Sequence, residues 1–293
     1  MPWLRYTVAP PDDGCTVRDL LTKRLGVSSS LRKALVRRKG VLLNEKDVFL
    51  SAVPAVGDVL TVDVTDPDAP SPIVSVDFPL SILWEDEHLL AVDKPAGITV
   101  HAAALTEEAV TVVGAAAHYL GNTAIHVVNR LDRGTSGVML LAKSGYMHAR
   151  CMELLHTEAF CRGYVAICEG VPEPAHGIID APIGRDETSL LRRCVRSYGQ
   201  PAVTEYEVQE TQNGRSLVQL LPRTGRTHQL RVHMAHIGHP LVGDWLYGTE
   251  DKALISRPAL HSYQLRFTHP LTGEVVALTA PLPEDMARLL EKT

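Results

Sequence analysis

One aspartate of this chain, Asp132, stands in a setting that could make its carboxylate a nucleophile. It lies between Arg130 and Arg133, and a Gly-Thr-Ser-Gly stretch that ends at Gly137 follows at once. Nearby guanidinium groups keep a carboxylate ionised, and a tight loop fixes its direction. Taken alone, the same stretch would more simply be a surface ion pair beside a turn, so other parts of the chain must decide between the two interpretations.

A second polar segment, 222–238, lies further along the chain. Its apolar residues recur with the spacing of one helix face, at Leu230, Met234 and Ile237. We predict a short amphipathic helix there, with Thr227 as its N-cap and Gly238 at its C-terminal end. Arg231 projects from a different side of this helix than Leu230. The segment therefore offers a cation that could face a carboxylate.

The elements that must position these residues fall into two units. Residues 66–75 hold three prolines, which fit neither a helix interior nor a central strand, so we predict a linker there. The unit before it, 1–65, is predicted to run strand, helix, helix, hairpin, strand. The unit after it, 76–293, alternates short β-rich segments with turns and a few helices. This pattern predicts an α+β fold with a central mixed, mainly antiparallel sheet.

Charge is distributed unevenly along the chain. The net charge is −5, yet residues 18–46 hold nine Lys and Arg against two acidic residues. Within them we predict a helix over 31–39, which Ser28–Ser30 cap and Gly40 ends. One face of this helix is basic, with Arg32, Lys33, Arg37 and Arg38. Such a patch can bind phosphates on an acidic protein, because salt screens the more distant charges.

Five motifs in order carry a resemblance to a known family. They are Lys94-Pro-Ala-Gly-Ile-Thr-Val-His101, the segment Asn129 to Gly137, Arg162-Gly-Tyr-Val-Ala166, the segment Thr224 to His233, and Gly238-His-Pro-Leu-Val-Gly-Asp-x-x-Tyr-Gly248. Together they resemble the RluA-type family of RNA pseudouridine synthases. Element order and the stretches Val-Leu-Leu-Asn and Gly-Asp-Val-Leu-Thr-Val make the first unit resemble an S4-type RNA-binding module. The resemblance implies isomerisation of uridine to pseudouridine within RNA, without cofactor or metal.

The resemblance also implies roles for single residues. Asp132 would be the essential aspartate, acting as nucleophile at the ribose C1′ or as base in an elimination through a glycal. Arg231 would pair with it, and the ring of Tyr164 would stack on the flipped uracil. Substrate contacts would come from Arg130, Arg133, Thr135, Arg226, His228 and Gln229, and from Arg32, Lys33, Arg37 and Arg38. Asn129 and Arg162 stand where the family usually has His and Lys, and we expect any consequence to fall on RNA contact.

Several conspicuous residues are expected to have no chemical role. We expect Asp244 to be structural, in the turn after the second motif, and Trp84, Trp245 and Tyr247 to lie in the core or at a rim rather than to stack on RNA. We expect segment 283–292 to be a surface helix. Four histidines lie in or just after the second segment, namely His228, His233, His236 and His239. Their spacing matches neither His-Glu-x-x-His nor a zinc finger, so no metal site is expected.

Two other functions stay open at this point. A non-catalytic RNA-binding protein could keep the fold, although binding alone does not need an aspartate opposed to phosphate. A glycosidase-like hydrolase also needs a carboxylate at C1′, but such enzymes usually place two carboxylates around the bond, and these motifs offer one. Ribosomal and transfer RNA are both open as substrates.

Composition limits the setting of the protein. Hydrophobic residues are 45% and charged residues 22%, as in ordinary globular proteins. No apolar run is long enough to span a membrane, and the first residues lack the apolar core of a signal peptide. The five cysteines are scattered without a Cys-x-x-Cys pair, which favours free thiols in a reducing compartment. We expect a cytoplasmic monomer whose partner is RNA.

Overall fold

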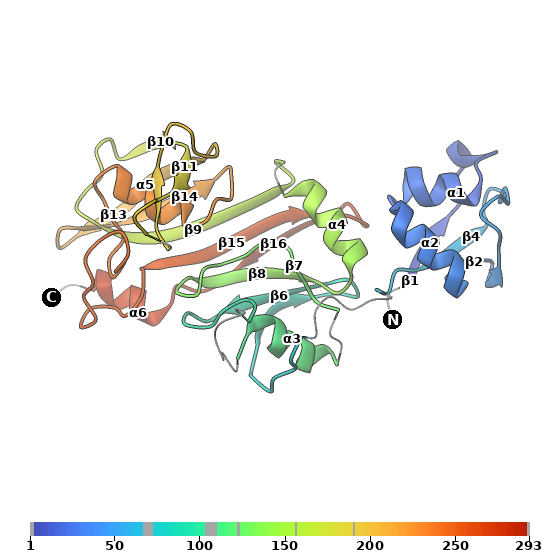
Figure 1. The fold of residues 1–293 in the computed structure, drawn as a ribbon, viewed down its shortest axis with the longest axis horizontal. Coiled ribbons are helices and arrows are strands. Elements are labelled where there is room, and N and C mark those ends of the chain that lie inside the picture. The colour runs from blue at the N-terminus through green and yellow to red at the C-terminus, as the bar shows by residue number, and fades with distance from the viewer. Residues whose placement is uncertain are drawn as a thin grey trace.

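The computed structural model describes residues 3–66, 73–102, 110–121, 124–155, 157–189 and 191–291, and its largest feature is a ten-stranded sheet (Figure 1). The strands of this sheet are β5 (Ser81–Glu85), β6 (Leu89–Lys94), β7 (His126–Val127), β8 (Ser136–Ala142), β9 (Phe160–Glu169), β10 (His176–Asp180), β13 (Val203–Gln212), β14 (Arg215–Pro222), β15 (Leu260–Thr268) and β16 (Val275–Thr279). The order is β10-β13-β14-β9-β15-β8-β6-β5, with β16 beside β15 and β7 beside β8. Only β15 and β8 pair in parallel among these described strands. The predicted α+β class and mixed, mainly antiparallel sheet are confirmed.

Helices cover both faces of the sheet where β6 and β8 lie. The helices of this unit are α3 (Val112–Leu120), α4 (Gly145–Leu154), α5 (Gln229–His236) and α6 (Glu284–Ala287), followed by the 3-10 turn η3 (Arg288–Leu290). Side chains alternate between faces along a strand. Leu90 and Met139 therefore pack in one core with α3, whereas Leu89 and Leu140 pack in another with Met147 of α4. Every residue of β8 is buried, so the loop that precedes it is fixed at one end.

The N-terminal unit is a separate four-stranded sheet with short helices, at the right of Figure 1. Its elements are β1 (Trp3–Thr7), β2 (Val41–Leu43), β3 (Lys46–Asp47) and β4 (Val59–Asp63), with η1 (Pro10–Asp12), α1 (Val17–Asp19), η2 (Leu20–Arg24) and α2 (Ser29–Arg38). The helix predicted over 31–39 begins earlier because Ser28 accepts the N–H of Leu31. Tyr146 of α4 joins the core of this unit, and its hydroxyl donates to the carbonyl of Leu25.

The first residue of the predicted linker contacts the larger unit. Asp66 accepts the backbone N–H of Gly145 at 2.8 Å and lies 2.5 Å from Nε2 of His126. Residues 67–72 lie outside the described residues. The sequence also predicts a helix over 107–120, of which residues 107–109 lie outside the described residues. The division into units 1–65, 66–75 and 76–293 stays a prediction.

The helix of the second motif starts later than predicted. We expected Thr227 as its N-cap, but the N-cap is His228, which adopts a left-handed conformation with φ of 57° and makes no side-chain cap bond. The prediction was wrong because residues 226–229 form a turn before the helix: the N–H of Gln229 donates to the carbonyl of Arg226, and the Gln229 side-chain oxygen accepts the N–H of Arg226. Leu230 and Met234 face the core as predicted, and Gly238, with φ of 86°, follows the end of the helix.

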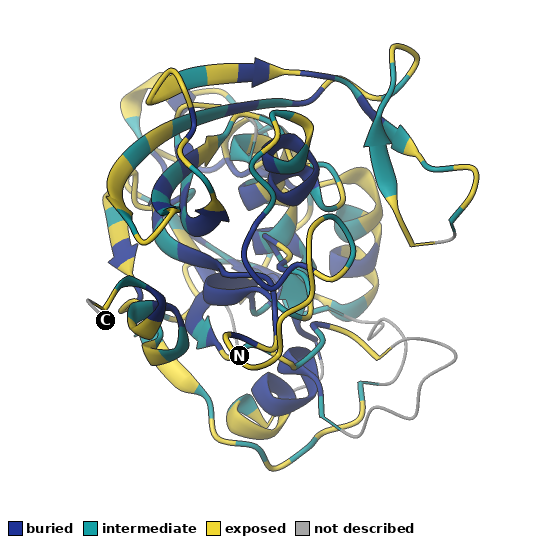
Figure 2. Ribbon diagram, turned by 90° about the vertical axis from the view of Figure 1, so that its left-hand side faces the viewer, coloured by how far each residue is buried: buried dark blue, intermediate teal, exposed yellow. Residues whose placement is uncertain are grey.

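A two-stranded arm stands off from the body beside α5. It consists of β11 (Ile183–Arg185) and β12 (Arg193–Val195), and Figure 2 shows it projecting from the compact part of the unit. Elsewhere the figure shows buried residues concentrated in the sheet and in the helices that touch it. Among the helices within the described ranges, none combines the length and apolar character that crossing a bilayer requires.

Candidate active site

Asp132, Tyr164 and Arg231 converge on one cleft from three different elements. Asp132 lies on the loop before β8, Tyr164 on β9 and Arg231 on α5. The cleft has a volume of about 570 Å³, and all three residues line it. The structure thus brings together the three residues to which the resemblance assigned catalysis, although Asp132 and Arg231 are far apart in the chain.

The carboxylate of Asp132 faces two cationic or polar side chains of the second motif. Nη1 of Arg231 lies 3.7 Å from Oδ2 of Asp132, and Nε2 of His228 lies 3.9 Å from the same oxygen. The Asp132 side chain is 35% exposed, so it can be reached from the cleft. Arg130 and Arg133, its neighbours in sequence, are exposed at the rim, and Nε of Arg133 donates to the carbonyl of Gly97 at 2.9 Å.

The guanidinium of Arg231 is held mainly by Asp244. Its Nε and Nη2 donate to the two oxygens of Asp244, each at 2.7 Å, and both side chains are buried. Burial alone lowers the pKa of Arg231, but the hydrogen bonds and charge of Asp244, with Asp132 adding to them, raise it. Asp244 also accepts the N–H groups of Leu246 and Tyr247. Asp244 is thus structural, as predicted, and it also aims Arg231 at Asp132.

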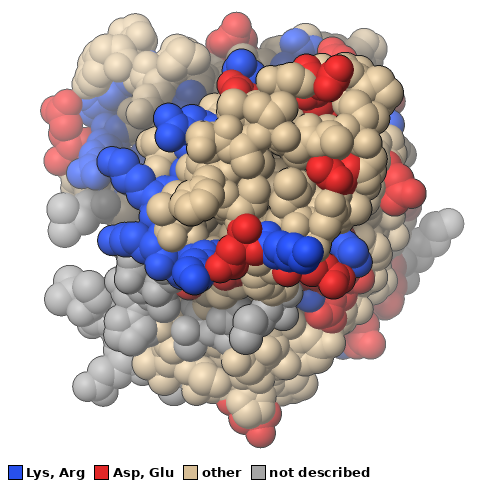
Figure 3. Space-filling model, turned by 90° about the vertical axis from the view of Figure 1, so that its right-hand side faces the viewer, with Lys and Arg blue, Asp and Glu red and all other residues tan. Residues whose placement is uncertain are grey.

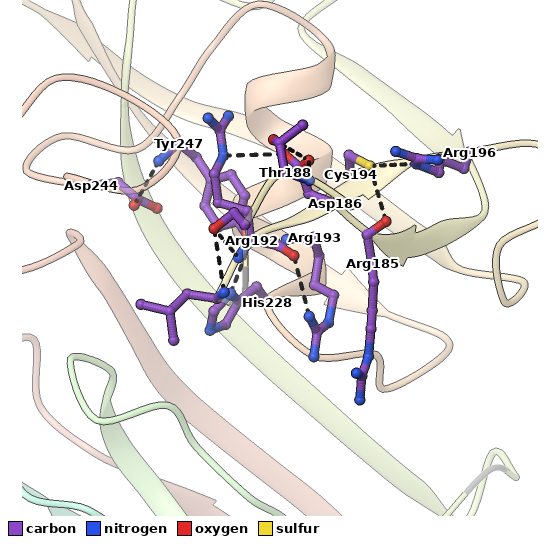
Figure 4. Close-up of polar contacts among 12 residues, drawn as sticks. Arg185, Asp186, Thr188, Arg192, Arg193, Cys194, Arg196, His228, Asp244 and Tyr247 are labelled. Atoms are coloured by element: carbon purple, nitrogen blue, oxygen red, sulfur yellow. Dashed lines mark hydrogen bonds and ion pairs between the residues drawn. The ribbon is translucent and has the colours of Figure 1, made fainter.

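Tyr247 packs at the edge of a small core cluster, as expected, and it also contacts residues of this site. Its hydroxyl lies 2.9 Å from Nδ1 of His228 and accepts the N–H of Arg193 from the arm (Figure 4). The guanidinium carbon of Arg231 lies 5.0 Å from the centre of its ring. Burial lowers the pKa of His228, which favours a neutral imidazole. The residues around Asp132 therefore form one connected network.

Two buried cations hold the backbone of the Asp132 loop. Nζ of Lys94 donates to the carbonyls of Arg133 and Thr135 at 3.2 and 2.8 Å, and also to that of Pro95. Nη1 of Arg257 donates to the carbonyl of Gly134 at 3.3 Å. Three successive carbonyls after Asp132 thus each accept a bond from a buried cation, which restricts where the carboxylate can point.

Arg257 is in turn held by the C-terminal helix α6. Its Nε and Nη2 donate to Asp285 at 2.7 and 2.8 Å. Segment 283–292, expected to be a plain surface helix, is therefore connected to the active-site loop through this ion pair. Sequence reasoning missed Lys94 and Arg257 as supports, because their partners lie 39 to 123 residues away in the chain.

Of the other residues predicted to form the site, some are buried and bonded to other protein groups, and others are exposed. Tyr164 is buried at 7% exposure, and burial raises its pKa, so its hydroxyl stays protonated. Gln229 uses both its oxygen and its nitrogen on protein groups, namely Thr224, Arg226, Val203 and Thr204. It therefore supports the cleft from within. Thr135 is buried, and Nε of Arg226 donates to the carbonyl of Pro201.

The two departures from the family pattern have different surroundings. Asn129 is buried, accepts the N–H of Leu140 at 2.7 Å and donates to the carbonyl of Val138. It therefore ties the Asp132 loop to β8, and it also lines the cleft. Arg162 lines the cleft too and lies against Gly225. Both departures thus lie at the cleft, and Asn129 in addition holds the loop.

The arm carries arginines that sequence reasoning did not single out. Figure 4 shows Arg192 and Arg193 near His228 and Tyr247, and Arg185 and Arg196 further away from both. Arg196 pairs with Glu187 at 2.8 Å, and Arg192 lies 3.9 Å from Asp186. The signal that could have revealed this cluster is its density: four arginines within twelve residues of a segment with turn residues at its centre.

The four basic residues predicted on α2 are not equivalent. Arg32 donates to Thr22 and to the carbonyl of Val27, and Arg38 pairs with Asp63 and donates to its carbonyl. Lys33 and Arg37 are exposed. Figure 3 shows Lys and Arg side chains along a band of this end of the molecule, interrupted by acidic groups. The predicted basic face is thus narrower than the sequence indicated.

Comparison with known proteins assigns the chain to one family. The family model of RNA pseudouridylate synthase matches residues 88–236, which include Asp132, Tyr164 and Arg231. The uncharacterized RNA pseudouridine synthase YjbO of Bacillus subtilis (strain 168) is 37% identical over 271 residues, covering 91% of this chain and 95% of that protein. The ribosomal large subunit pseudouridine synthase D of Escherichia coli (strain K12) is 39% identical over 232 residues, covering 73% and 71% of the two chains.

Solved structures agree with this assignment. Human RNA pseudouridylate synthase domain containing 4 matches with a TM-score of 0.57 and 28% identity, covering 71% of this chain and 90% of that one. The chain therefore belongs to the RNA pseudouridylate synthase family, and it is an isomerase that acts on uridine in RNA. The predicted family and enzyme class are confirmed. The likeness of the N-terminal unit to an S4 module stays a prediction.

Proposed function

We propose that the protein converts specific uridines of structured RNA to pseudouridine, with Asp132 acting at the ribose. The observation that carries the proposal is the position of the Asp132 carboxylate, which lies 3.7 Å from the Arg231 guanidinium in a cleft that Tyr164 also lines. In the reaction the N1–C1′ bond breaks, the uracil turns, C5 bonds to C1′, and the hydrogen on C5 is lost. The Asp132 carboxylate serves either as the nucleophile at C1′ or as the base of an elimination.

The neighbours of Asp132 support an oriented, reactive carboxylate. The Arg231 guanidinium lies within ion-pair reach of it, and Asp244 fixes that guanidinium. The ring of Tyr164 offers a face for the uracil once the base has left its stack. His228, which lies on the same side as Arg231, contributes a polar contact rather than a full charge, because burial lowers its pKa.

The surroundings of Asp244, the second carboxylate near the site, argue against the alternative of a glycosidase-like hydrolase. A hydrolase of that type needs a second acid that can exchange a proton or activate water. Asp244 is fully buried, and its oxygens accept bonds from Arg231, Leu246 and Tyr247. A carboxylate so engaged has no free oxygen to offer to a substrate or a water molecule. This arrangement supports isomerisation with a single reacting carboxylate.

The substrate is proposed to be ribosomal RNA first, with transfer RNA as the alternative. The name of the Escherichia coli relative, a ribosomal large subunit enzyme, supports this order. We also propose that unit 1–65 is an S4-like RNA-binding module whose exposed Lys33 and Arg37 contact phosphates, together with the arginines of the arm. The enzyme is proposed to act as a cytoplasmic monomer.

Tritium release from RNA labelled at C5 of uridine tests this function. Ribosomal and transfer RNA transcripts are each incubated with wild type, Asp132→Ala and Asp132→Asn. Because C5 loses its hydrogen only when it bonds to C1′, wild type should release tritium from at least one transcript. Both variants should lose at least about a thousandfold in rate while keeping most of their RNA affinity.

A matched control separates a chemical role from a general effect of removing a carboxylate. Glu207 is exposed on β13, and Glu207→Gln should keep the wild-type rate. Substantial release by a clean Asp132→Ala preparation would contradict the role of Asp132. Tight binding of both transcripts without any release by wild type would favour the non-catalytic RNA-binding alternative.

A further inference from the structure

A second cavity opens on the other side of Asp132. Its volume is about 720 Å³, and it shares with the cleft the residues Asp132, Arg133, Thr135, His228 and Arg231. The two cavities therefore meet at the carboxylate. Each has one aromatic residue that the other lacks, because Tyr164 lines only the cleft and Trp245 lines only the second cavity.

Trp245 is an exposed indole on a firmly held turn. Its residue is 53% exposed, whereas the other two tryptophans, Trp3 and Trp84, are partly buried. The preceding residue, Asp244, binds Arg231, and the N–H groups of Leu246 and Tyr247 donate to Asp244. A single exposed apolar residue is ordinary, but an exposed ring whose backbone is fixed on both sides forms a ready surface for stacking.

The position of this ring matches the path that an RNA strand must take. When a target uridine occupies the Tyr164 cleft with its ribose at Asp132, the adjoining nucleotide must leave along the other side of that carboxylate. The exposed guanidinium of Arg133 stands where the cavities meet, where a phosphate between the two nucleotides would pass. Bases stack on exposed aromatic rings of proteins whatever their sequence, and this contact adds to binding by single-stranded RNA.

We propose that Trp245 is the stacking platform for the base next to the target uridine. The second cavity is then a subsite for that nucleotide, and the preferred substrate is unpaired at both positions. This inference rests on the proposed function, since it uses the target ribose at Asp132 as its fixed point. Leu191, which is 60% exposed and reaches this cavity from the arm, gives the base an apolar neighbour.

The first experiment compares Trp245→Leu with Trp245→Phe. Loss of the ring should raise KM and the Kd for uridine-containing loop RNA about tenfold, whereas Phe, which keeps a ring, should stay close to wild type. The effect should fall on KM more than on kcat. Tyr119→Ala is the matched control, because Tyr119 is 50% exposed on α3 outside both cavities, and it should change neither value.

The second experiment reads stacking directly and does not need turnover. Two loop RNAs carry 2-aminopurine on the 5′ or the 3′ side of the target uridine, and binding to Asp132→Ala protein is followed by its fluorescence. Quenching of one of the two probes that is lost in Asp132→Ala/Trp245→Leu but kept in Asp132→Ala/Trp245→Phe supports the proposal and identifies the side.

The outcomes separate this inference from the proposed function. Equal affinity of Trp245→Leu and wild type, or quenching of both probes that does not depend on Trp245, would overturn the inference while tritium release by wild type still stands. Quenching that depends on Trp245, with no tritium release by wild type, would keep the nucleotide subsite and contradict the proposed reaction. Pairing the neighbouring base in a duplex should weaken binding to wild type but not to Trp245→Leu.

Discussion

The active site and helix α2 use arginine in opposite ways. At the active site, Arg231 and Arg257 are buried, and each holds a carboxylate through two hydrogen bonds. On α2, Lys33 and Arg37 extend into solvent. A buried guanidinium with fixed partners defines geometry, whereas an exposed cation contributes a field that salt screens. The first kind of charge should therefore control the rate, and the second should control affinity and its salt dependence.

The comparison is tested most severely by removing the partner of Arg231. Asp244→Asn leaves Arg231 buried without its two-bond partner, so its guanidinium should shift relative to Asp132. We expect kcat to fall about a hundredfold, because small misplacements at a reacting centre have effects of this size. The free energy of unfolding should also fall by about 3–5 kcal/mol. Single-turnover tritium release and chemical denaturation measure the two effects.

A surface pair provides the control for that variant. Arg223 pairs with Glu205 at the surface; neither residue lines the cleft, and their side chains are 59% and 37% exposed. Glu205→Gln should change the free energy of unfolding by less than about 1 kcal/mol and leave kcat unchanged. Equal losses of kcat and of unfolding free energy in Asp244→Asn and Glu205→Gln would contradict the idea that a buried ion pair matters more than an exposed one.

The second prediction concerns the support from the C-terminal helix. Arg257→Met removes the donor to the Gly134 carbonyl, and Asp285→Asn removes only the partner that holds Arg257. We expect kcat to fall about tenfold to thirtyfold in the first and less in the second, with KM little changed. The double variant should lose no more than Arg257→Met, because both changes act through one contact. Additive losses would mean that Asp285 acts by another route.

Lys94 gives the site an expected pH dependence. Burial lowers the pKa of Lys94 from 10.5 to about 8, while Asp132 opposes and Arg257 reinforces the shift. Above that pH the neutral amine has one donor fewer for its three carbonyls, so kcat should fall up to about tenfold by pH 9. Lys94→Met should be slow at every pH and lack this decline. A wild-type rate that stays level to pH 10 would contradict this role.

The stability of the protein should move the other way over the same range. A lysine whose pKa is lower in the folded protein binds fewer protons there than in the unfolded chain between pH 8 and 10.5. The free energy of unfolding contributed by Lys94 therefore rises with pH in this window. Loss of activity there, with unchanged or higher stability in denaturant, would separate a change in the loop from unfolding.

The smallest effects are expected on α2. Lys33→Ala with Arg37→Ala should weaken RNA binding by about threefold to fivefold and reduce its salt dependence by about two phosphate contacts, without changing kcat. Arg32→Ala and Arg38→Ala remove contacts within the unit and should lower stability instead. Filter binding at several salt concentrations, with thermal unfolding, distinguishes the pairs. A salt dependence equal to wild type would show that Lys33 and Arg37 do not contact RNA.

The sequence predicts what depends on neighbouring residues and misses what depends on distant ones. The spacing of Leu230 and Met234 predicts α5, and Ser28 marks the start of α2, because helix faces and caps are local. The N-cap of α5 was predicted wrongly, because a turn over residues 226–229 delays the start of the helix to Gln229. The sequence predicts that Arg231 lies beside Asp132 only because the motifs resemble a known family.

The supports of the site had no local signal. Lys94 appears in sequence as the end of a strand before proline, and Arg257 as an arginine before proline. Both side chains donate to carbonyl groups of the Asp132 loop, which only the folded chain brings close to them. In the sequence, Arg32 and Arg38 cannot be told apart by charge from Lys33 and Arg37. A pattern of charges does not show which side chains find a partner, as Arg32 does in Thr22 and Arg38 does in Asp63.

The ion pair of Arg257 and Asp285 has a consequence for the order in which the enzyme matures. During synthesis the Asp132 loop emerges early, together with Lys94, but the arginine that binds the Gly134 carbonyl follows much later. The carboxylate that holds this arginine comes later still. A nascent chain that stops before residue 285 would have its reactive aspartate in place on a loop without its last restraint. The enzyme should thus reach its full rate on RNA only after synthesis has passed α6.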